Sequence, residues 1–125
     1  MDAKKILGNK GEAIAAKYLI KKGLVFIEKN FYAQGGEIDL IFKNPQTKNY
    51  VFVEVKTRTY NSLSNIKESV TRFKIMKMLS AISAYFFKKL HLAEMPAFQI
   101  DAIFLEVKNN KIFCEHVENI GMDDF

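Results

Sequence analysis

The chain has almost no cysteine and no long apolar run, and both absences narrow what it can be. Cys114 is the only cysteine among 125 residues, so no internal disulfide can form, which suits a reducing compartment. No apolar stretch approaches the roughly 20 residues of a transmembrane helix. The first residues also lack the apolar segment of a signal peptide. We therefore expect a cytoplasmic protein with no membrane partner.

Zinc ligands are equally scarce. A single cysteine and two histidines, His91 and His116, fit no zinc-ligand spacing, and His116 is expected to be a surface or satisfied strand histidine. What the chain has in abundance is apolar material, at 49% hydrophobic residues with 11 Phe. A chain of this length and composition predicts one folded domain over residues 1–125, with a substantial core.

The hydrophobic pattern predicts a mixed α/β fold. Apolar residues at helical spacing predict a first helix over 12–22, and Phe73, Met78 and Ile82 mark a long second helix that ends at Leu90. That helix begins either at an Asn65 to Glu68 capping box or at Thr71. We expect a polar connection over 30–36 and a loop over 59–64. Strands are expected over 24–27, 37–43, 50–57, 98–107 and 112–117. The order α-β-β-β-α-β-β predicts a mixed sheet covered by two helices.

Charged residues interrupt two of these apolar strands. Glu54 and Lys56 project from one face of the 50–57 strand, while Glu37 and Asp39 share a face of the preceding one. Antiparallel pairing of the two strands can bring Asp39 close to Glu54. Two carboxylates about 4 Å apart repel by roughly 4 kcal/mol at an effective dielectric of 20, and a divalent cation reverses that sign. Hard oxygen ligands favour Mg²⁺ or Mn²⁺.

Spacing alone leaves other interpretations open. Glu54 could form a plain ion pair with Lys56 or Arg58 on a half-exposed strand. Glu37 either supports the metal ligands or is only a carboxylate at a strand end. Basic residues gather on the second helix, with a net charge of +5 over the chain. They form either a solvated face or a phosphate-contacting surface. The candidate phosphate contacts are Arg58, Arg72, Lys74 and Lys77.

Two strand motifs, Gly35-Gly36-Glu37-Ile38-Asp39 and Phe52-Val53-Glu54-Val55-Lys56-Thr57-Arg58, resemble those of the bacterial YraN family. Gly11-Glu12 resembles that family's first helix, and Asp101 its late-strand aspartate. The family in turn resembles the restriction-endonuclease-like PD-(D/E)XK fold and the archaeal Holliday-junction resolvases. Here Gly-Glu-Ile-Asp stands in place of the Pro-Asp of the motif's name.

This resemblance implies roles for named residues. Asp39, Glu54 and Lys56 would take the acid, acid and lysine positions of the catalytic motif, and Glu12 the acid carried by the helix. Without the resemblance, Glu12 is a carboxylate that suits a first helical turn. Asp39 and Glu54 would bind Mg²⁺ or Mn²⁺ with the Val55 carbonyl as a third ligand, and Glu37 would support them.

The expected function is a metal-dependent nuclease acting on DNA, including branched or single-stranded DNA. The resolvase likeness also suggests a homodimer. One alternative is a nucleic-acid-binding module of the same fold that cleaves little on its own. Another is a metal-free interaction protein in which the charges form ion pairs.

Overall fold

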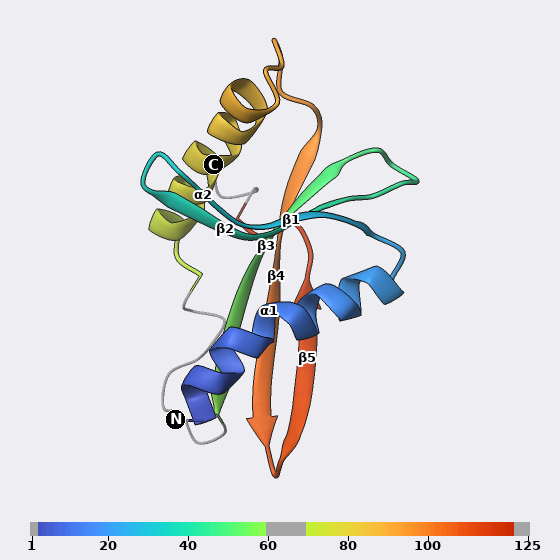
Figure 1. Ribbon diagram of the computed structural model, residues 1–125, viewed down its shortest axis with the longest axis vertical. Coiled ribbons are helices and arrows are strands. Elements are labelled where there is room, and N and C mark those ends of the chain that lie inside the picture. The colour runs from blue at the N-terminus through green and yellow to red at the C-terminus, as the bar shows by residue number, and fades with distance from the viewer. Residues whose placement is uncertain (1–2, 60–69, 122–125) are drawn as a thin grey trace.

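The computed structural model describes residues 3–59 and 70–121, and its elements follow the predicted order. Two helices, α1 and α2, and five strands form a mixed α/β fold, and a short π-helix, η2, continues α2 (Figure 1). The elements are α1 (Ala3–Lys21), β1 (Val25–Ala33), β2 (Gly36–Lys43), β3 (Tyr50–Thr59), α2 (Arg72–Ala84), η2 (Tyr85–Lys89), β4 (Phe98–Lys108) and β5 (Lys111–Val117).

The five strands form one sheet in the order β1-β2-β3-β4-β5. The pairs β1–β2, β2–β3 and β4–β5 are antiparallel, so the predicted hairpin of β2 and β3 is confirmed. β3 and β4 run parallel, because the chain between them crosses over through α2. Figure 1 shows α1 lying across the sheet on one side, while α2 packs beside the β1–β2 hairpin.

The two helices cover opposite faces of the sheet, each over its own apolar cluster. Beneath α1, Ala15 and Leu19 pack with Val51 and Val53 of β3. Beneath α2, Ile82 and the side chains of η2 pack with Phe52. Alternate residues of β3 thus point to opposite clusters, as the strand period requires. Glu54 follows Phe52 on the α2 face.

The first helix begins earlier than predicted. α1 starts at Ala3 rather than at Glu12, so Glu12 lies in its interior and the expectation of a first-turn carboxylate is wrong. Gly11 suggested a helix start because glycine is about 1 kcal/mol worse than alanine inside a helix. Here Gly11 is needed where α1 crosses β3, since an added Cβ would lie only 2.8 Å from Cγ2 of Thr57.

The strand predicted over 24–27 was too short, and the polar connection predicted over 30–36 was too long. β1 continues to Ala33, and the turn consists of Gln34 and Gly35, both with positive φ. Positive φ at both central residues is the pattern of a type I′ hairpin turn. The polar residues Glu28, Lys29 and Asn30 in its middle hid the length of this strand, and they are tolerated because β1 is an edge strand with one open side.

The second helix begins at the alternative site, Thr71, whose side-chain hydroxyl accepts a 3.2 Å hydrogen bond from the N–H of Lys74. The Asn65 to Glu68 capping box and the 59–64 loop lie outside the described residues, apart from Thr59, which ends β3. Among the helices described, none is long and apolar enough to cross a membrane.

Candidate metal centre

The sheet opens at the point where its carboxylates gather. The β2–β3 ladder runs from Lys43–Tyr50 to Leu40–Val53, and Asp39 and Glu54 occupy the next position along. At this position a side chain replaces the backbone of β2 as the hydrogen-bond acceptor for β3. Oδ2 of Asp39 accepts a 2.8 Å hydrogen bond from the N–H of Val55. The N–H and C=O of one strand residue point to the same neighbour. The Val55 carbonyl therefore faces this opening too.

Asp39 also lies where β2 changes sides. Ile38 packs in the cluster beneath α2, whereas Leu40, two residues on, packs beneath α1. Residues two apart normally share a face, so the strand twists strongly through Asp39. This twist turns the carboxylate into the opening between β2 and β3.

Two further carboxylates reach the same opening. Oxygen atoms of Glu12, Glu37 and Asp39 all lie within 4.8 Å of one another. Gly11 positions Glu12 there, because the missing side chain lets α1 approach β3 closely. With its amide in the orientation that satisfies its neighbours, Asn30 donates to both Glu12 oxygens, at 3.0 and 2.9 Å.

Burial and the neighbouring acids raise the pKa of two carboxyls in this cluster, those of Asp39 and Glu12. Burial raises the pKa of Asp39 to about 8, with further contributions from Glu54, Glu37 and Glu12, while the Val55 N–H opposes them. Burial and the neighbouring Glu37 raise the pKa of Glu12 as well. A bound divalent cation would offset the cost of ionising these groups.

Glu54 is the most deeply buried of the four acids, at 3% exposed. Its Oε1 lies 3.4 Å from Nζ of Lys56 and 3.6 Å from Nζ of Lys74. Its Oε2 is buried with no hydrogen-bond partner in the described part of the chain. A buried carboxylate oxygen without a donor is costly, and a cation is one group that would satisfy it.

The donor set therefore fits a hard divalent cation. It consists of carboxylate oxygens and one backbone carbonyl, the ligands that Mg²⁺ and Mn²⁺ prefer. Glu12, Glu37 and Asp39 bring their oxygens close enough to share an ion, and Glu54 does not belong to that group of three. Asp39, Glu54 and the Val55 carbonyl remain the ligand set predicted from the sequence.

The structure also places the basic residues named from the sequence. The predicted ion pair of Glu54 with Lys56 is present, and Lys74 joins it from α2. Lys77 and Arg72 are exposed on α2, where Arg72 has a partner of its own. The Arg58 side chain lies outside the described part of the chain. The contact of Lys74 with Glu54 was not expected, because it depends on how α2 docks on the sheet.

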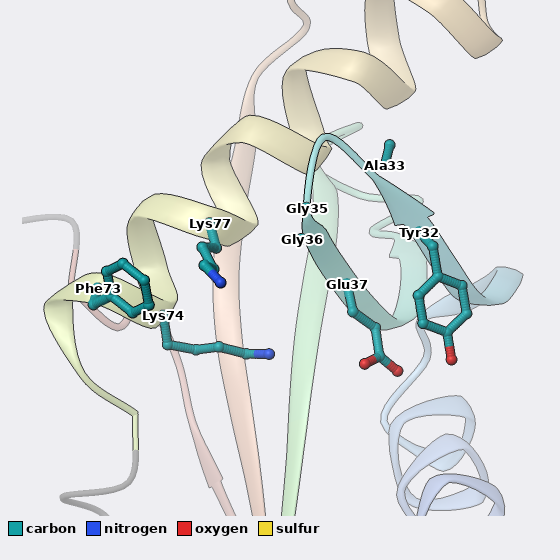
Figure 2. A pocket seen from close by; sticks show the side chains of 8 residues that line it. All are labelled: Tyr32, Ala33, Gly35, Gly36, Glu37, Phe73, Lys74 and Lys77. Atoms are coloured by element: carbon teal, nitrogen blue, oxygen red, sulfur yellow. The ribbon is translucent and has the colours of Figure 1, made fainter.

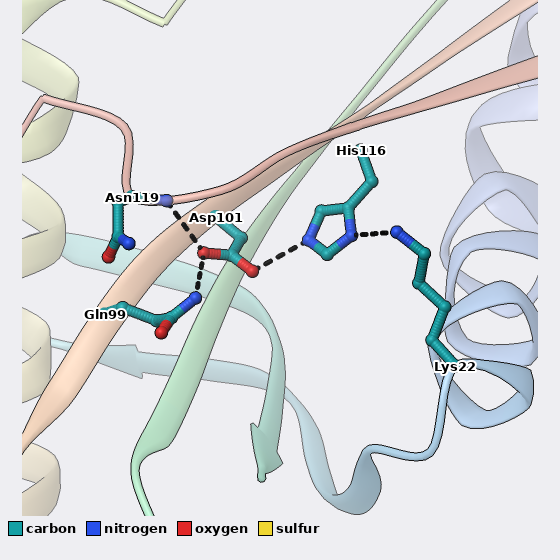
Figure 3. A network of polar contacts seen from close by, with 5 residues as sticks. All are labelled: Lys22, Gln99, Asp101, His116 and Asn119. Carbon is teal, nitrogen blue, oxygen red and sulfur yellow. Dashed lines mark hydrogen bonds and ion pairs between the residues drawn. The ribbon is translucent and has the colours of Figure 1, made fainter. Parts of the chain in front are cut away.

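A second polar cluster lies around Asp101, which is 1% exposed. Its Oδ1 accepts hydrogen bonds from Nε2 of Gln99 and the N–H of Asn119, and its Oδ2 contacts Nε2 of His116 at 2.7 Å (Figure 3). Nδ1 of His116 lies 2.9 Å from Nζ of Lys22. With Lys22 charged, Nδ1 accepts and Nε2–H donates to Asp101. Glu118 lies within reach of a shared ion, but both His116 nitrogens and both Asp101 oxygens are already engaged. The expectation of a satisfied strand histidine agrees with this network.

The fold and this site together define a small α/β protein whose sheet opens around a cluster of buried carboxylates. The chain belongs to the Uncharacterised protein family UPF0102, whose sequence profile matches residues 11–107, as the YraN resemblance indicated. The matched span contains the four acids, Lys56 and Lys74, and it ends before His116.

Bacterial relatives carry the same family name. A UPF0102 protein of Caldanaerobacter subterraneus subsp. tengcongensis is 40% identical over 119 residues, which cover 94% of this chain and 93% of that protein. A UPF0102 protein of Pelobacter propionicus is 35% identical, over 90% of this chain and 79% of that protein. One of Vibrio campbellii is 38% identical, over 82% and 79%.

Proposed function

We propose that this protein is a Mg²⁺- or Mn²⁺-dependent nuclease that hydrolyses phosphodiester bonds of DNA. The observation that carries the proposal is the opening between β2 and β3. There Asp39 meets Glu12 and Glu37, and Glu54 has a buried oxygen for which the residues that the structure describes offer no donor. The resemblance to restriction-endonuclease-like proteins supports the same interpretation of these residues.

In this proposal the bound cation supplies Lewis-acid assistance to phosphodiester hydrolysis. Asp39 and Glu54 bind and orient it from two strands, and the Val55 N–H fixes the Asp39 rotamer. Lys56, two residues from Glu54, offers an ammonium group that orients the attacking water or offsets charge on the phosphate. Lys74 can hold Glu54 when Lys56 turns toward the substrate.

One observation favours the alternative of a nucleic-acid-binding module with little cleavage. Both Lys56 and Lys74 lie against Oε1 of Glu54, so the charge of this carboxylate is already offset without a metal. In that case the lysines would be structural partners, and DNA would bind along the basic side of α2 through its phosphates.

The deciding experiment is cleavage of end-labelled single-stranded, duplex, flap and four-way DNA with Mg²⁺ or Mn²⁺. We expect wild type to cut at least one of these substrates and Asp39→Ala to be inactive but folded. Lys56→Met should lose on the order of 100-fold in rate, while Lys74→Met retains cleavage. Equal cleavage by Asp39→Ala and wild type would refute the assignment. Binding without cleavage in every case would favour the alternative. We further propose that the protein acts in the cytoplasm and that it is a homodimer. Analytical ultracentrifugation tests the oligomeric state.

A further inference from the structure

A groove of about 660 Å³ lies between the tip of the β1–β2 hairpin and the first turns of α2. Tyr32 and Glu37 line it from the hairpin side, and Phe73, Lys74 and Lys77 from the helix side (Figure 2). Its volume falls within the roughly 300–1,000 Å³ of pockets that hold small organic ligands. The groove is thus large enough for the base and sugar of a nucleotide.

Two aromatic rings stand at its margins with most of their surface in solvent. Tyr32 is 66% exposed and Phe73 67%. Figure 2 shows Tyr32 on the hairpin side of the groove and Phe73 on the α2 side. Single exposed apolar residues are ordinary. A pair of them across one groove, with cations between, is the arrangement that holds stacked bases.

The cations come from α2. Nζ of Lys77 lies 4.7 Å from the centre of the Phe73 ring, a cation–π contact. Lys74 reaches from the same helix toward the sheet (Figure 2), where it meets Glu54. A ligand with flat rings joined by negative charges could therefore stack its rings on the aromatic side chains and place its charges beside the lysines.

The groove leads directly to the carboxylates. Glu37 lines it and also belongs to the cluster with Glu12 and Asp39, and Lys74 lines it and contacts Glu54. The Tyr32 hydroxyl hydrogen-bonds Glu37, and the charge of Glu37 raises the pKa of that phenol. A strand lying in the groove would thus have a phosphate beside the candidate metal centre.

The walls of the groove are held close together by a glycine. A Cβ at Gly36 would collide with the backbone carbonyl of Lys77, so the hairpin rests directly on α2 at this point. The tight turn through Gln34 and Gly35 precedes it. The two aromatic rings therefore project from elements that are packed against each other.

We propose that this groove binds unpaired nucleotides, with bases stacked on Phe73 and Tyr32 and a phosphate contacted by Lys77. Bases in continuous duplex are stacked on each other and present no free face, so the substrate would be single-stranded or branched DNA with an unpaired segment beside the scissile bond. The cleavage part of this statement rests on the proposed nuclease function, but the binding part does not.

The test measures binding in EDTA, where cleavage plays no part. Labelled DNA is offered as a single strand, a forked duplex with unpaired arms, and a blunt duplex. Stacking on one aromatic side chain corresponds to roughly 5- to 100-fold in affinity. We expect Phe73→Leu and Tyr32→Leu to lose that much on single-stranded and forked DNA and less than twofold on blunt duplex. Tyr32→Phe, which keeps the ring, should bind as wild type does. Phe113→Leu on β5 is the matched control, since Phe113 is also exposed, at 54%.

A second measurement uses the absence of tryptophan from the chain. Phe73→Trp places a single emitter at the groove, and stacking of a base on it should quench its fluorescence when single-stranded DNA is added. Phe113→Trp should show no quenching. Equal loss on all three DNAs, or unchanged affinity in folded Phe73→Leu, would overturn the proposal. Failure of the wild type to bind any of the three DNAs would also overturn the proposal and would favour a protein partner in the groove. Stacking without cleavage would sustain this inference and contradict the nuclease.

Discussion

Asp39 on β2 accepts a 2.8 Å hydrogen bond from the backbone N–H of Val55 on β3, at the position where the two strands stop pairing. The side chain of one strand thus replaces its backbone as the partner of the next. The carboxylate is held in the opening by this bond.

The first prediction concerns pH in the absence of metal. Burial raises the pKa of Asp39 from its ordinary 3.8 to about 8, so the native state binds a proton that the unfolded chain releases between these values. The contribution of Asp39 to stability should therefore be fully present below about pH 4, fall as pH rises to about 8, and then level off. Asp39→Asn should remove much of this slope and be more stable than wild type at pH 9 in EDTA, by about 1–3 kcal/mol. Urea denaturation from pH 4 to 9 measures both chains.

The control for that experiment is Glu118→Gln, which changes an exposed acid near the other polar cluster. It should keep the slope of the wild type. An Asp39→Asn chain with an unchanged pH dependence would show that this carboxyl is ionised in the native state throughout the range.

The second prediction is stabilisation by divalent metal. An ion that binds only the folded state at 100 times its dissociation constant adds about 2.7 kcal/mol. We expect Mg²⁺ or Mn²⁺ to raise the melting temperature of wild type and of Glu118→Gln, but not of Asp39→Asn. Glu12→Gln should show a smaller rise. Loss of the effect in Glu118→Gln would instead locate the ion at the Asp101 cluster. Titration by thermal unfolding, against an EDTA reference, is the measurement.

The third prediction concerns the crossing of α1 over β3. Gly11→Ala gains about 1 kcal/mol of helix propensity but places its methyl group against Cγ2 of Thr57, at a cost of about 1–3 kcal/mol. Thr57→Ser removes Cγ2 of Thr57, the methyl group that the Gly11→Ala side chain would contact. The double variant should therefore be more stable than the sum of the single effects, and the coupling is read from a double-mutant cycle. Additive effects would mean that the helix shifts freely. In that case Gly11 would not position Glu12.

The fourth prediction concerns Asp101. Asp101→Ala leaves His116, Gln99 and the Asn119 N–H without their acceptor in a buried site. We expect a loss of about 3–5 kcal/mol in the free energy of unfolding. Metal-dependent stabilisation should remain in the folded fraction. Lys22→Met, which removes an exposed partner of His116, should change stability by less than about 1 kcal/mol. A comparable loss in both variants would show that the network acts as one unit.

Strand periodicity explains why part of the candidate site was predictable. Side chains alternate along β3, so Phe52 and Glu54 share the α2 face and Val53 the other, as their packing shows. A short turn between β2 and β3 fixes their register, so Asp39 and Glu54 each follow directly after the last paired residues, Leu40 and Val53. Such local rules need no knowledge of the helices.

The contributions of the helices could not be predicted in the same way. Lys74 reaches Glu54 only because α2 docks where Gly36 permits close contact. Phe73 counted as an apolar mark of a buried helix face, yet it is exposed beside the groove. Glu12 was predicted at a helix start because Gly11 precedes it. Gly11 is instead inside α1, where it allows the helix to pack closely against β3. The bond between Asp101 and His116 joins neighbouring strands at a register that no motif specified.

The β2–β3 ladder ends at Leu40 and Val53. Beyond these residues the β1–β2 hairpin separates from the β3–β4–β5 part of the sheet. The acids come from three elements, with Glu12 on α1, Glu37 and Asp39 on β2, and Glu54 on β3. Their spacing therefore depends on how α1 and α2 pack on the two faces of the sheet. Substitutions deep beneath either helix should therefore alter the spacing of the acids without touching any of them.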